Sequence, residues 1–273
     1  VLAYVGASLP LLLIFTVTDV GLVDALTTEV IAIEILRGLV GSIGIIAAGG
    51  KSTRTGLSEF TTKAALPLLG RPLLAHQLDF LRRSSVPRAI VICRPEHARL
   101  LGRLLSPEER AMTAFVVSDC GRGWAGELER AGAHYGDSDE VLIVSCDNYH
   151  AGEALRLPHG ADALHTYTTL IEGRSPTDGP ILARCDDGRW RPSGGINPAR
   201  PGECRDSGSF FSGYIVVRGK HLRHALAQIR PSPRGEKEIV DLLGVLHWDT
   251  RCRAVPYGGE YIDIADLAAL ARL

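Results

Sequence analysis

Short apolar runs and amphipathic segments alternate along the chain from residue 43 onward. The runs are rich in Ile, Val and Leu, which favours strands buried on both faces. The amphipathic segments repeat apolar residues three or four positions apart, which predicts helices that pack on a core. Expected strands are 42–48, 89–93, 114–117 and 140–146, and expected helices are 72–83, 96–105 and 125–135. This order predicts an α/β fold with a mostly parallel mixed sheet and helices on both faces.

The pattern changes after residue 147. Segments 163–170, 180–185 and 211–217 indicate strands without regular helices between them, which is typical of an inserted, more antiparallel substrate region. A long loop is expected at 189–208, because that stretch is rich in Gly, Pro, Arg and Ser. Helices are expected at 220–229, 237–246 and 265–273, and a last strand at 261–264.

The first residues form a separate hydrophobic segment. Residues 1–17 carry no charge, and about 17 residues is the shortest length that can span a bilayer. A second apolar stretch, 30–48, is interrupted by Glu34 and Arg37. Two interpretations remain open, a membrane-derived segment and a helical leader that packs on the following domain.

Charge and cysteine content narrow the class of protein. The formal net charge of -1 gives no support to a nucleic-acid-binding surface. The six cysteines form no C-x-x-C pair and match no zinc site. They are therefore predicted to be reduced, mostly buried thiols of a cytoplasmic protein.

A glycine-containing loop follows the first expected strand. Residues 48–54 have the sequence AGGKSTR. Glycines at a strand end let backbone N–H groups approach an anion, so a phosphate-binding loop is one interpretation and an ordinary strand-to-helix turn is the other. The dinucleotide fingerprint G-x-G-x-x-G and the Walker A pattern are both absent.

Two acidic residues stand at the ends of expected strands. Asp147 follows the strongest strand, in the sequence VSCDN, and Asp263 lies in EYIDIA near the end of the chain. A carboxylate at such a position is suited to hold Mg²⁺ against a bound triphosphate. For Asp147, a cap of a helix or turn is the alternative.

The sequence after the glycine loop resembles the sugar-phosphate nucleotidyltransferase family. Residues 63–73, KAALPLLGRPL, are similar to the family's P-K-x-L-x-P and G-x-P-x-L patterns, and residues 49–54 are similar to G-G-x-G-T-R. The matching positions are Gly49, Gly50, Thr53, Arg54, Lys63, Leu66 and Pro67. Ser52 replaces the third glycine and Thr62 replaces the proline.

The resemblance implies roles for particular residues. Arg54 is expected to grip the leaving pyrophosphate, Lys63 to contact the α-phosphate, and Asp147 with Asp263 to hold Mg²⁺. The expected catalytic residues are Arg54, Lys63 and Asp147. The expected nucleotide contacts are Ala48, Gly49, Gly50, Lys51, Ser52, Thr53, Gly123 and Ala125.

Further similarities concern the base and the sugar phosphate. Residues 123–126, GWAG, resemble the family's G-T-A-G against base and sugar, so Trp124 is either a stacking surface or part of the core. Residues 238–241, EIVD, resemble a helix that serves the fold. Gly213 and Asn197 are expected near the sugar phosphate, although Asn197 stands where relatives carry E-K-P and supplies no lysine.

The hydrophobic segment resembles a different family. GASLPLLLIF at 6–15 and TEVIAIEILRGLVGSIG at 28–44 are similar to the closing membrane segments of the YibE/F family of integral membrane proteins. A junction is therefore expected near residues 42–45, from a gene fusion or a chimeric sequence. The expected division is a leader at 1–42 and a nucleotidyltransferase domain at 43–273.

The resemblance implies a Rossmann-like nucleotidyltransferase fold and a magnesium-dependent enzyme. Such an enzyme moves an NMP from an NTP to a sugar 1-phosphate or similar phosphorylated alcohol, and releases pyrophosphate. A binding module of the same fold that has lost turnover is the alternative, motivated by Ser52, Thr62 and the missing lysine. The expected partners are an NTP and a sugar 1-phosphate. A membrane contacted through residues 1–42 and further copies of the chain stay open as partners.

Overall fold

The computed structural model describes most of the chain from the first expected strand onward. The described residues are 42–48, 61–119, 121–151, 165–171, 181–196, 198, 202, 204–249 and 251–264. The hydrophobic leader, the glycine loop at 49–54 and the helix expected at 265–273 lie outside these ranges. Among the described residues, no helix is both long and apolar enough to cross a bilayer.

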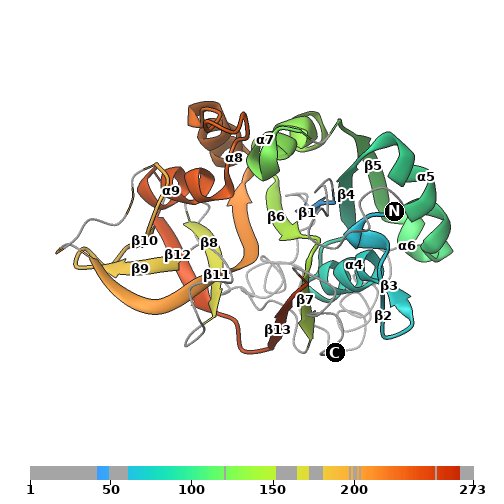
Figure 1. Ribbon diagram of the computed structural model, residues 1–273, viewed down its shortest axis with the longest axis horizontal. Coiled ribbons are helices and arrows are strands. Elements are labelled where there is room, and N and C mark those ends of the chain that lie inside the picture. Colours follow the sequence, from blue (N-terminus) through green and yellow to red (C-terminus); the bar gives the residue numbers. More distant parts are fainter. Residues whose placement is uncertain are drawn as a thin grey trace, which may run out of the picture.

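A nine-stranded mixed sheet forms the centre of the described structure (Figure 1). Its main path runs β10-β9-β11-β6-β1-β4-β5, with β8 on β11 and β12 on β8. The bounds are β1 Ser42–Ala47, β4 Arg88–Cys93, β5 Thr113–Val117, β6 Glu140–Ser145, β8 His165–Ile171, β9 Ile181–Cys185, β10 Trp190–Pro192, β11 Cys204–Arg218 and β12 Arg251–Pro256. Two short pairs complete it: β2 Pro67–Leu68 with β3 Arg71–Pro72, and β7 Asn148–Ala151 with β13 Glu260–Asp263.

Parallel pairing joins the strands that come first in the chain and, later in the chain, β8 and β12. Strands β6, β1, β4 and β5 run parallel, which requires crossovers and accounts for the helices between them. Strand β11 is antiparallel to β6, β8 and β9. The predicted change to antiparallel pairing after residue 147 is therefore confirmed.

Helices cover both faces of this sheet, as predicted. The bounds are η2 Lys63–Ala65, α4 Leu73–Arg83, α5 Pro95–Leu104, α6 Pro107–Ala111, α7 Gly123–Arg130, η3 Ala131–His134, α8 Gly219–Gln228 and α9 Ile239–Asp249. Helices α4 and α5 contribute to one buried cluster, and α7, α8 and α9 contribute to the other. The α/β fold class expected from the sequence is confirmed.

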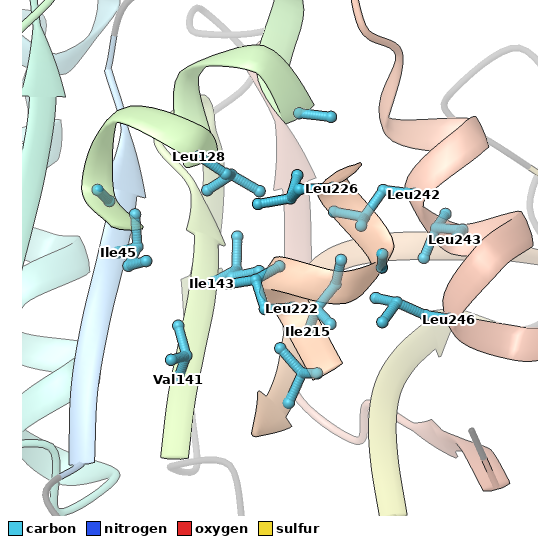
Figure 2. Packing of buried hydrophobic residues seen from close by; sticks show 14 of the residues in the cluster. Ile45, Leu128, Val141, Ile143, Ile215, Leu222, Leu226, Leu242, Leu243 and Leu246 are labelled. Carbon is cyan, nitrogen blue, oxygen red and sulfur yellow. The ribbon is translucent and has the colours of Figure 1, made fainter. Parts of the chain in front are cut away.

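The two-residue period of β1 divides its side chains between these clusters. Ile43 and Ile45 belong to the cluster under α7, α8 and α9, whereas Ile46 belongs to the cluster under α4 and α5. Figure 2 shows Leu128 of α7, Leu226 of α8 and Leu242 of α9 directed into one apolar layer with Ile143 of β6. Because both faces of the central strands are buried, these strands appear in the sequence as continuous apolar runs.

The loop predicted at 189–208 is wrong in part. Residues Trp190–Pro192 form β10, and β11 begins at Cys204, so strands occupy both ends of the segment. Strand β10 is an edge strand of three residues, too short to show a period in the sequence. Strands β7 and β12 also went unpredicted, because their pairing partners lie far away in the chain.

The cysteine prediction is correct for three residues and wrong for two. Cys93, Cys146 and Cys252 are buried free thiols. Cys185 and Cys204 instead form a disulfide, because the antiparallel register of β9 and β11 places them directly opposite each other. The two residues are 19 positions apart, so the sequence alone did not show the pairing.

Two buried histidines predict a loss of stability in mild acid. Burial lowers the pKa of His150 from 6.5 to about 3 and that of His247 from 6.5 to about 4. Between those values and pH 6.5 the unfolded chain takes up protons that the folded chain does not. The free energy of unfolding should therefore be at its full value above about pH 6.5 and fall below it, by at most about 1.4 kcal/mol per pH unit for each histidine.

Urea unfolding at about pH 7.5 and about pH 5 measures this slope. His247→Gln should reduce the slope, because it removes one of the two buried histidines whose pKa burial lowers. A free energy of unfolding that stays constant between the two pH values would contradict the expectation.

Candidate active site

An ion pair lies at the carboxyl end of the parallel strand β6. Lys63 Nζ donates to Asp147 Oδ2 at 3.1 Å, and the two side chains are 15% and 35% exposed. Asp147 lies in the turn that follows β6, and Ser145 Oγ donates to its other oxygen, Oδ1. The structure thus brings together two of the predicted catalytic residues, which are 84 positions apart in the chain.

Thr62 helps to place Lys63 beside the end of β1. Its Oγ1 donates to the carbonyl of Ala48 at 3.4 Å, and the Ala48 N–H donates to Ile92 O at 2.9 Å. Thr62 is 1% exposed, and Lys63 follows it as the first residue of η2. The threonine that departs from the family pattern therefore supplies a hydrogen bond that a proline would lack.

Asp263 reaches the same region from the last described strand. Strand β13 pairs with β7 so that Asp263 lies opposite Asn148, and Figure 1 shows the two strands side by side. The Ile264 N–H donates to Asp147 O at 2.8 Å. The backbones of the two acids therefore lie at neighbouring positions, although the two residues are 116 positions apart in the sequence.

This donor set suits a hard cation. Mg²⁺ takes oxygen ligands, and it usually binds one or two carboxylates while waters and substrate phosphates complete its shell. Within the described ranges, no group of three or more His, Cys, Asp or Glu side chains is arranged to hold a metal. Asp147 in the turn between β6 and β7 and Asp263 of β13 supply two carboxylates of this kind at neighbouring backbone positions.

Gly213 allows β11 to approach Asn148. Its φ is +96°, and the register of β11 on β8 shifts between Phe211 and Ile215. A Cβ at Gly213 would lie 2.2 Å from Asn148 Nδ2. The Asn148 amide also donates to the Ser212 carbonyl at 3.3 Å, so β11 fixes the residue that pairs with Asp263.

Gly213→Ala should destabilise the protein and disturb this junction. The left-handed backbone and the collision with Asn148 together should lower the free energy of unfolding by about 2 to 4 kcal/mol. Gly188→Ala is the matched control, because Gly188 has a φ of +79° but no atom within 4 Å of its added Cβ. That control should cost only about 1 to 2 kcal/mol. Equal losses in chemical denaturation would show that the contact with Asn148 contributes nothing.

Aromatic side chains pack beneath the β7–β13 pair. The Phe80 and Tyr214 rings stack with centroids 4.4 Å apart, and His150 lies 3.9 Å from Tyr214 and 5.2 Å from Tyr261. The His150 ring also contacts the Ser212 carbonyl through Nε2 at 2.8 Å. This buried layer ties α4, β7, β11 and β13 together and limits movement of the strand ends that carry the aspartates.

Helix α7 begins at the segment that was expected to face the nucleotide. Gly123 has a φ of +75°, and the Ala125 N–H donates to Lys237 O at 3.2 Å. Trp124 packs against the buried cluster of α7, α8 and α9, with its ring centroid 6.1 Å from that of Phe211. The core interpretation of Trp124 thus has direct support.

Helix α9 anchors the segment next to Asn197. Asp241 Oδ1 accepts from the Ile196 N–H at 2.8 Å, and a Cβ at Gly244 would lie 1.8 Å from Ile196 O. The EIVD sequence therefore serves the fold, as expected, by holding the chain at Ile196. Asn197 itself lies outside the described residues, as do Gly49, Gly50, Lys51, Ser52, Thr53 and Arg54.

Sequence reasoning missed three supporting side chains. Ser145 was detectable, because it precedes Asp147 by two positions and residues two apart in an extended chain share a face. Gln77, which is 1% exposed and donates to Asn148 O, gave no signal within its helix. Asn148 was visible beside Asp147, but its contact with β11 was not.

The sequence comparison identifies the family. The profile of the MobA-like NTP transferase domain matches residues 44–241, from β1 into α9. The chain belongs to the MobA-like NTP transferase family. The match includes both partners of the Lys63–Asp147 pair and confirms the predicted nucleotidyltransferase resemblance. Residues 1–53 match the YibE/F-like protein family, which confirms the second resemblance.

Individual relatives of this MobA-like NTP transferase are distant. It is 32% identical over 106 residues to a protein of Sulfolobus acidocaldarius named provisionally as a mannose-1-phosphate guanyltransferase, covering 38% of this chain and 30% of that one. It is 26% identical over 205 residues to the glucose-1-phosphate thymidylyltransferase of Neisseria meningitidis, covering 73% and 69%. A Bacillus anthracis structure, provisionally named a glucose-1-phosphate thymidylyltransferase, shares the fold with a TM-score of 0.71 at 20% identity, covering 85% and 93%.

Proposed function

We propose that the chain transfers a nucleoside monophosphate from an NTP to a sugar 1-phosphate or a similar phosphorylated alcohol. A phosphate oxygen of the acceptor forms a bond to the α-phosphorus of the NTP. The bond between that phosphorus and the oxygen bridging to the β-phosphate breaks, and pyrophosphate leaves with the electron pair. The product is an NDP-sugar.

The observation that carries this proposal is the Lys63–Asp147 pair, 3.1 Å apart at the carboxyl end of β6. Ligands of open α/β sheets bind outside the carboxyl ends of the strands. Phosphoryl-type transfer needs positioned charge more than covalent help from the protein. Lys63 supplies a cation for the phosphates within a family of NTP transferases, and the partly exposed pair is open to a substrate.

Asp147 and Asp263 would hold the magnesium ion that the family resemblance implies. When bound, the ion supplies charge neutralisation at the phosphate oxygens. Asp147 retains capacity for it, because each carboxylate oxygen has two lone pairs and the contacts from Lys63 and Ser145 each use one. Ser145 and the Ile264–Asp147 backbone bond orient the carboxylate for this task.

The second substrate is expected beside the segment that α9 anchors at Ile196. Gly213 and Asn197 remain the proposed sugar-phosphate contacts, and Arg54 the proposed contact to the leaving pyrophosphate. The Asp241–Ile196 bond of 2.8 Å supports the proposal by fixing the residue before Asn197. A phosphorylated acceptor held without an E-K-P lysine would depend more on backbone donors at this segment.

A binding module without turnover is not favoured. Such a module has no need for an acid–lysine pair beside a second acid. Here Lys63 and Asp147 are joined, and β13 brings Asp263 to the position opposite Asn148. Thr62, one of the departures that motivated the alternative, supports the position of Lys63 through its bond to Ala48.

Pyrophosphate release by the full-length chain tests the proposal. Each of the four NTPs would be offered with MgCl₂ against glucose, mannose, galactose and N-acetylglucosamine 1-phosphates. Release that requires one NTP together with one acceptor is the expected result. Nucleotide binding without release from any pair would overturn the proposed reaction in favour of the binding module.

A further inference from the structure

The Cys185–Cys204 disulfide closes a loop that contains Ile196 and Asn197, the acceptor segment. The bond joins the end of β9 to the start of β11, and the two cysteines are 19 positions apart. Between them the chain forms β10 and reaches Ile196, whose N–H donates to Asp241 Oδ1 at 2.8 Å. Asn197, a proposed contact to the sugar phosphate, is the next residue. The covalent bond therefore constrains the stretch on which the proposed acceptor binding depends.

The disulfide lies at the end of the ladder between β9 and β11. Cys185 pairs with Cys204 at the first residue of β11, and the ladder continues as far as Ile181 and Phe210. Strand β9 is also paired with β10 on its other side. Backbone pairing thus sets the register of β9 without the covalent bond, and the ends of an element open more readily than its centre. Breaking the bond should therefore loosen the loop and leave the sheet in place.

The turn after Cys185 connects the disulfide to α9. The Cys185 N–H donates to Arg189 O at 2.7 Å, and Arg189 Nη1 donates to the Trp248 carbonyl at 3.4 Å. The Arg191 guanidinium lies 4.6 Å from the centroid of the Trp248 ring. Helix α9 also carries Asp241, the residue that anchors the acceptor segment. Both the disulfide and α9 therefore hold the same loop.

One end of the disulfide is accessible to a reductant. A thiolate must reach one of the two sulfurs to break the bond. Cys204 is partly exposed, whereas Cys185 is 6% exposed. The free thiols Cys93, Cys146 and Cys252 are 0%, 6% and 7% exposed. Cys204 is therefore the most exposed of the cysteines within the described ranges, and its sulfur is the expected point of attack.

We propose that the Cys185–Cys204 bond is a redox switch that controls how firmly the acceptor segment is held. This inference rests on the proposed nucleotidyl transfer and adds a regulation of its second substrate. A disulfide of this kind is reduced by a dithiol, either a small molecule or a protein, and is formed again by exchange with an oxidised disulfide of the same class.

The exchange proceeds in two displacements. A thiolate of the dithiol forms a bond to Cys204 Sγ, the bond between the two cysteine sulfurs breaks, and its electron pair leaves on Cys185 Sγ, which takes up a proton. The second thiolate of the dithiol then attacks the first sulfur of that molecule and releases Cys204, which also takes up a proton. Two cysteine thiols are formed, and the dithiol is oxidised to a disulfide.

Reduction should weaken acceptor use and leave NTP use nearly constant. A cross-link limits the conformations open to the loop between its ends, and these conformations become available when the bond is broken. A segment that must be ordered again on binding lowers affinity, so kcat/KM for the sugar 1-phosphate should fall by roughly threefold to tenfold. The KM for NTP should change little, because Lys63 and Asp147 lie outside the loop.

Two-substrate kinetics on the full-length chain tests the switch in both redox states. The chain would be oxidised with oxidised glutathione or reduced with dithiothreitol, and alkylation followed by peptide mapping would verify the state of Cys185 and Cys204. Hydrogen exchange at the Ile196 amide, which is bonded to Asp241, provides a readout that needs no turnover. We expect that exchange to be faster in the reduced chain, and the oxidised kinetics to return when the chain is oxidised again.

Two variants separate the switch from general effects of the reductant. The double variant Cys185→Ala and Cys204→Ala should behave like the reduced parent chain under both conditions. Cys93→Ala should respond to the reductant as the parent does, because Cys93 is a buried free thiol of β4. A disulfide that serves stability alone would lower the melting temperature on reduction and leave kcat/KM for the acceptor unchanged.

The outcomes separate this inference from the function on which it rests. Equal acceptor kinetics in the two redox states, or a bond that dithiothreitol does not reduce in the folded chain, would overturn the switch and leave nucleotidyl transfer standing. Faster exchange at Ile196 without pyrophosphate release from any substrate pair would overturn the transfer and leave redox control of the segment. Unchanged exchange without release would overturn both.

Discussion

Replacement of Asp147 by asparagine should lower the rate of pyrophosphate release by roughly two to three orders of magnitude. The amide keeps the shape of the side chain but removes the charge that pairs with Lys63 at 3.1 Å and that would hold a cation. The start of α7 and its contacts to Lys237 are unaffected, so nucleotide affinity should change much less than kcat. Initial rates at saturating substrate measure the effect, with calorimetric titration of NTP beside them.

Asp139→Asn is the control for this variant. Asp139 precedes the same strand, β6, and its carboxylate accepts from the Gly136 N–H instead of facing Lys63. Its replacement should leave kcat within about twofold, as expected for a surface change away from the site. If Asp147→Asn and Asp139→Asn had the same rates, the ion pair would have no part in the chemistry.

Gly244→Ala, a substitution inside helix α9, should weaken binding of the sugar 1-phosphate acceptor. A Cβ there would lie 1.8 Å from the Ile196 carbonyl oxygen, so the segment at Ile196 must move away from α9. A displacement on the order of 1 Å of a positioning segment can cost about a hundredfold in rate. We expect kcat/KM for the sugar 1-phosphate to fall by roughly tenfold to a hundredfold, while the KM for NTP stays nearly constant. Two-substrate steady-state kinetics separates the two constants.

Gly102→Ala controls for the effect of alanine in a helix. Gly102 lies in α5, and its added Cβ would meet only Phe115 Cε2, at an ordinary 3.7 Å. This variant should raise the free energy of unfolding by about 0.5 to 1 kcal/mol, because alanine is the better helix former. Gly244→Ala should instead lower it, since overpacking costs about 1 to 3 kcal/mol. A stabilised Gly244→Ala enzyme with unchanged kinetics would contradict the role given to α9.

Local patterns predicted the parallel half of the fold well. Strands β1, β4 and β6 are buried on both faces, so their sequences are continuous apolar runs, and α4 begins within one residue of its expected start. The family pattern assigned Lys63 to the α-phosphate and Asp147 to the magnesium ion, so both residues were expected at one site, whereas the ion pair between them was not predicted.

Features that depend on pairing between residues far apart in the chain were harder to predict from the sequence. Strand β7 has four residues and exists only because β13 pairs with it, more than a hundred positions later. The Cys185–Cys204 disulfide depends on the register of β9 and β11, which no local period encodes.

The most direct test of the proposed reaction follows the α-phosphorus of the donor nucleotide. The full-length chain would be incubated with NTP labelled at that atom, MgCl₂ and a sugar 1-phosphate, and the products would be separated and identified by mass. Nucleotidyl transfer predicts that the label appears in an NDP-sugar, in equal amount with pyrophosphate, and that Asp147→Asn slows the formation of both by the same factor. Label found in free NMP, formed without the acceptor, would show hydrolysis by water and contradict the transfer proposed for this site.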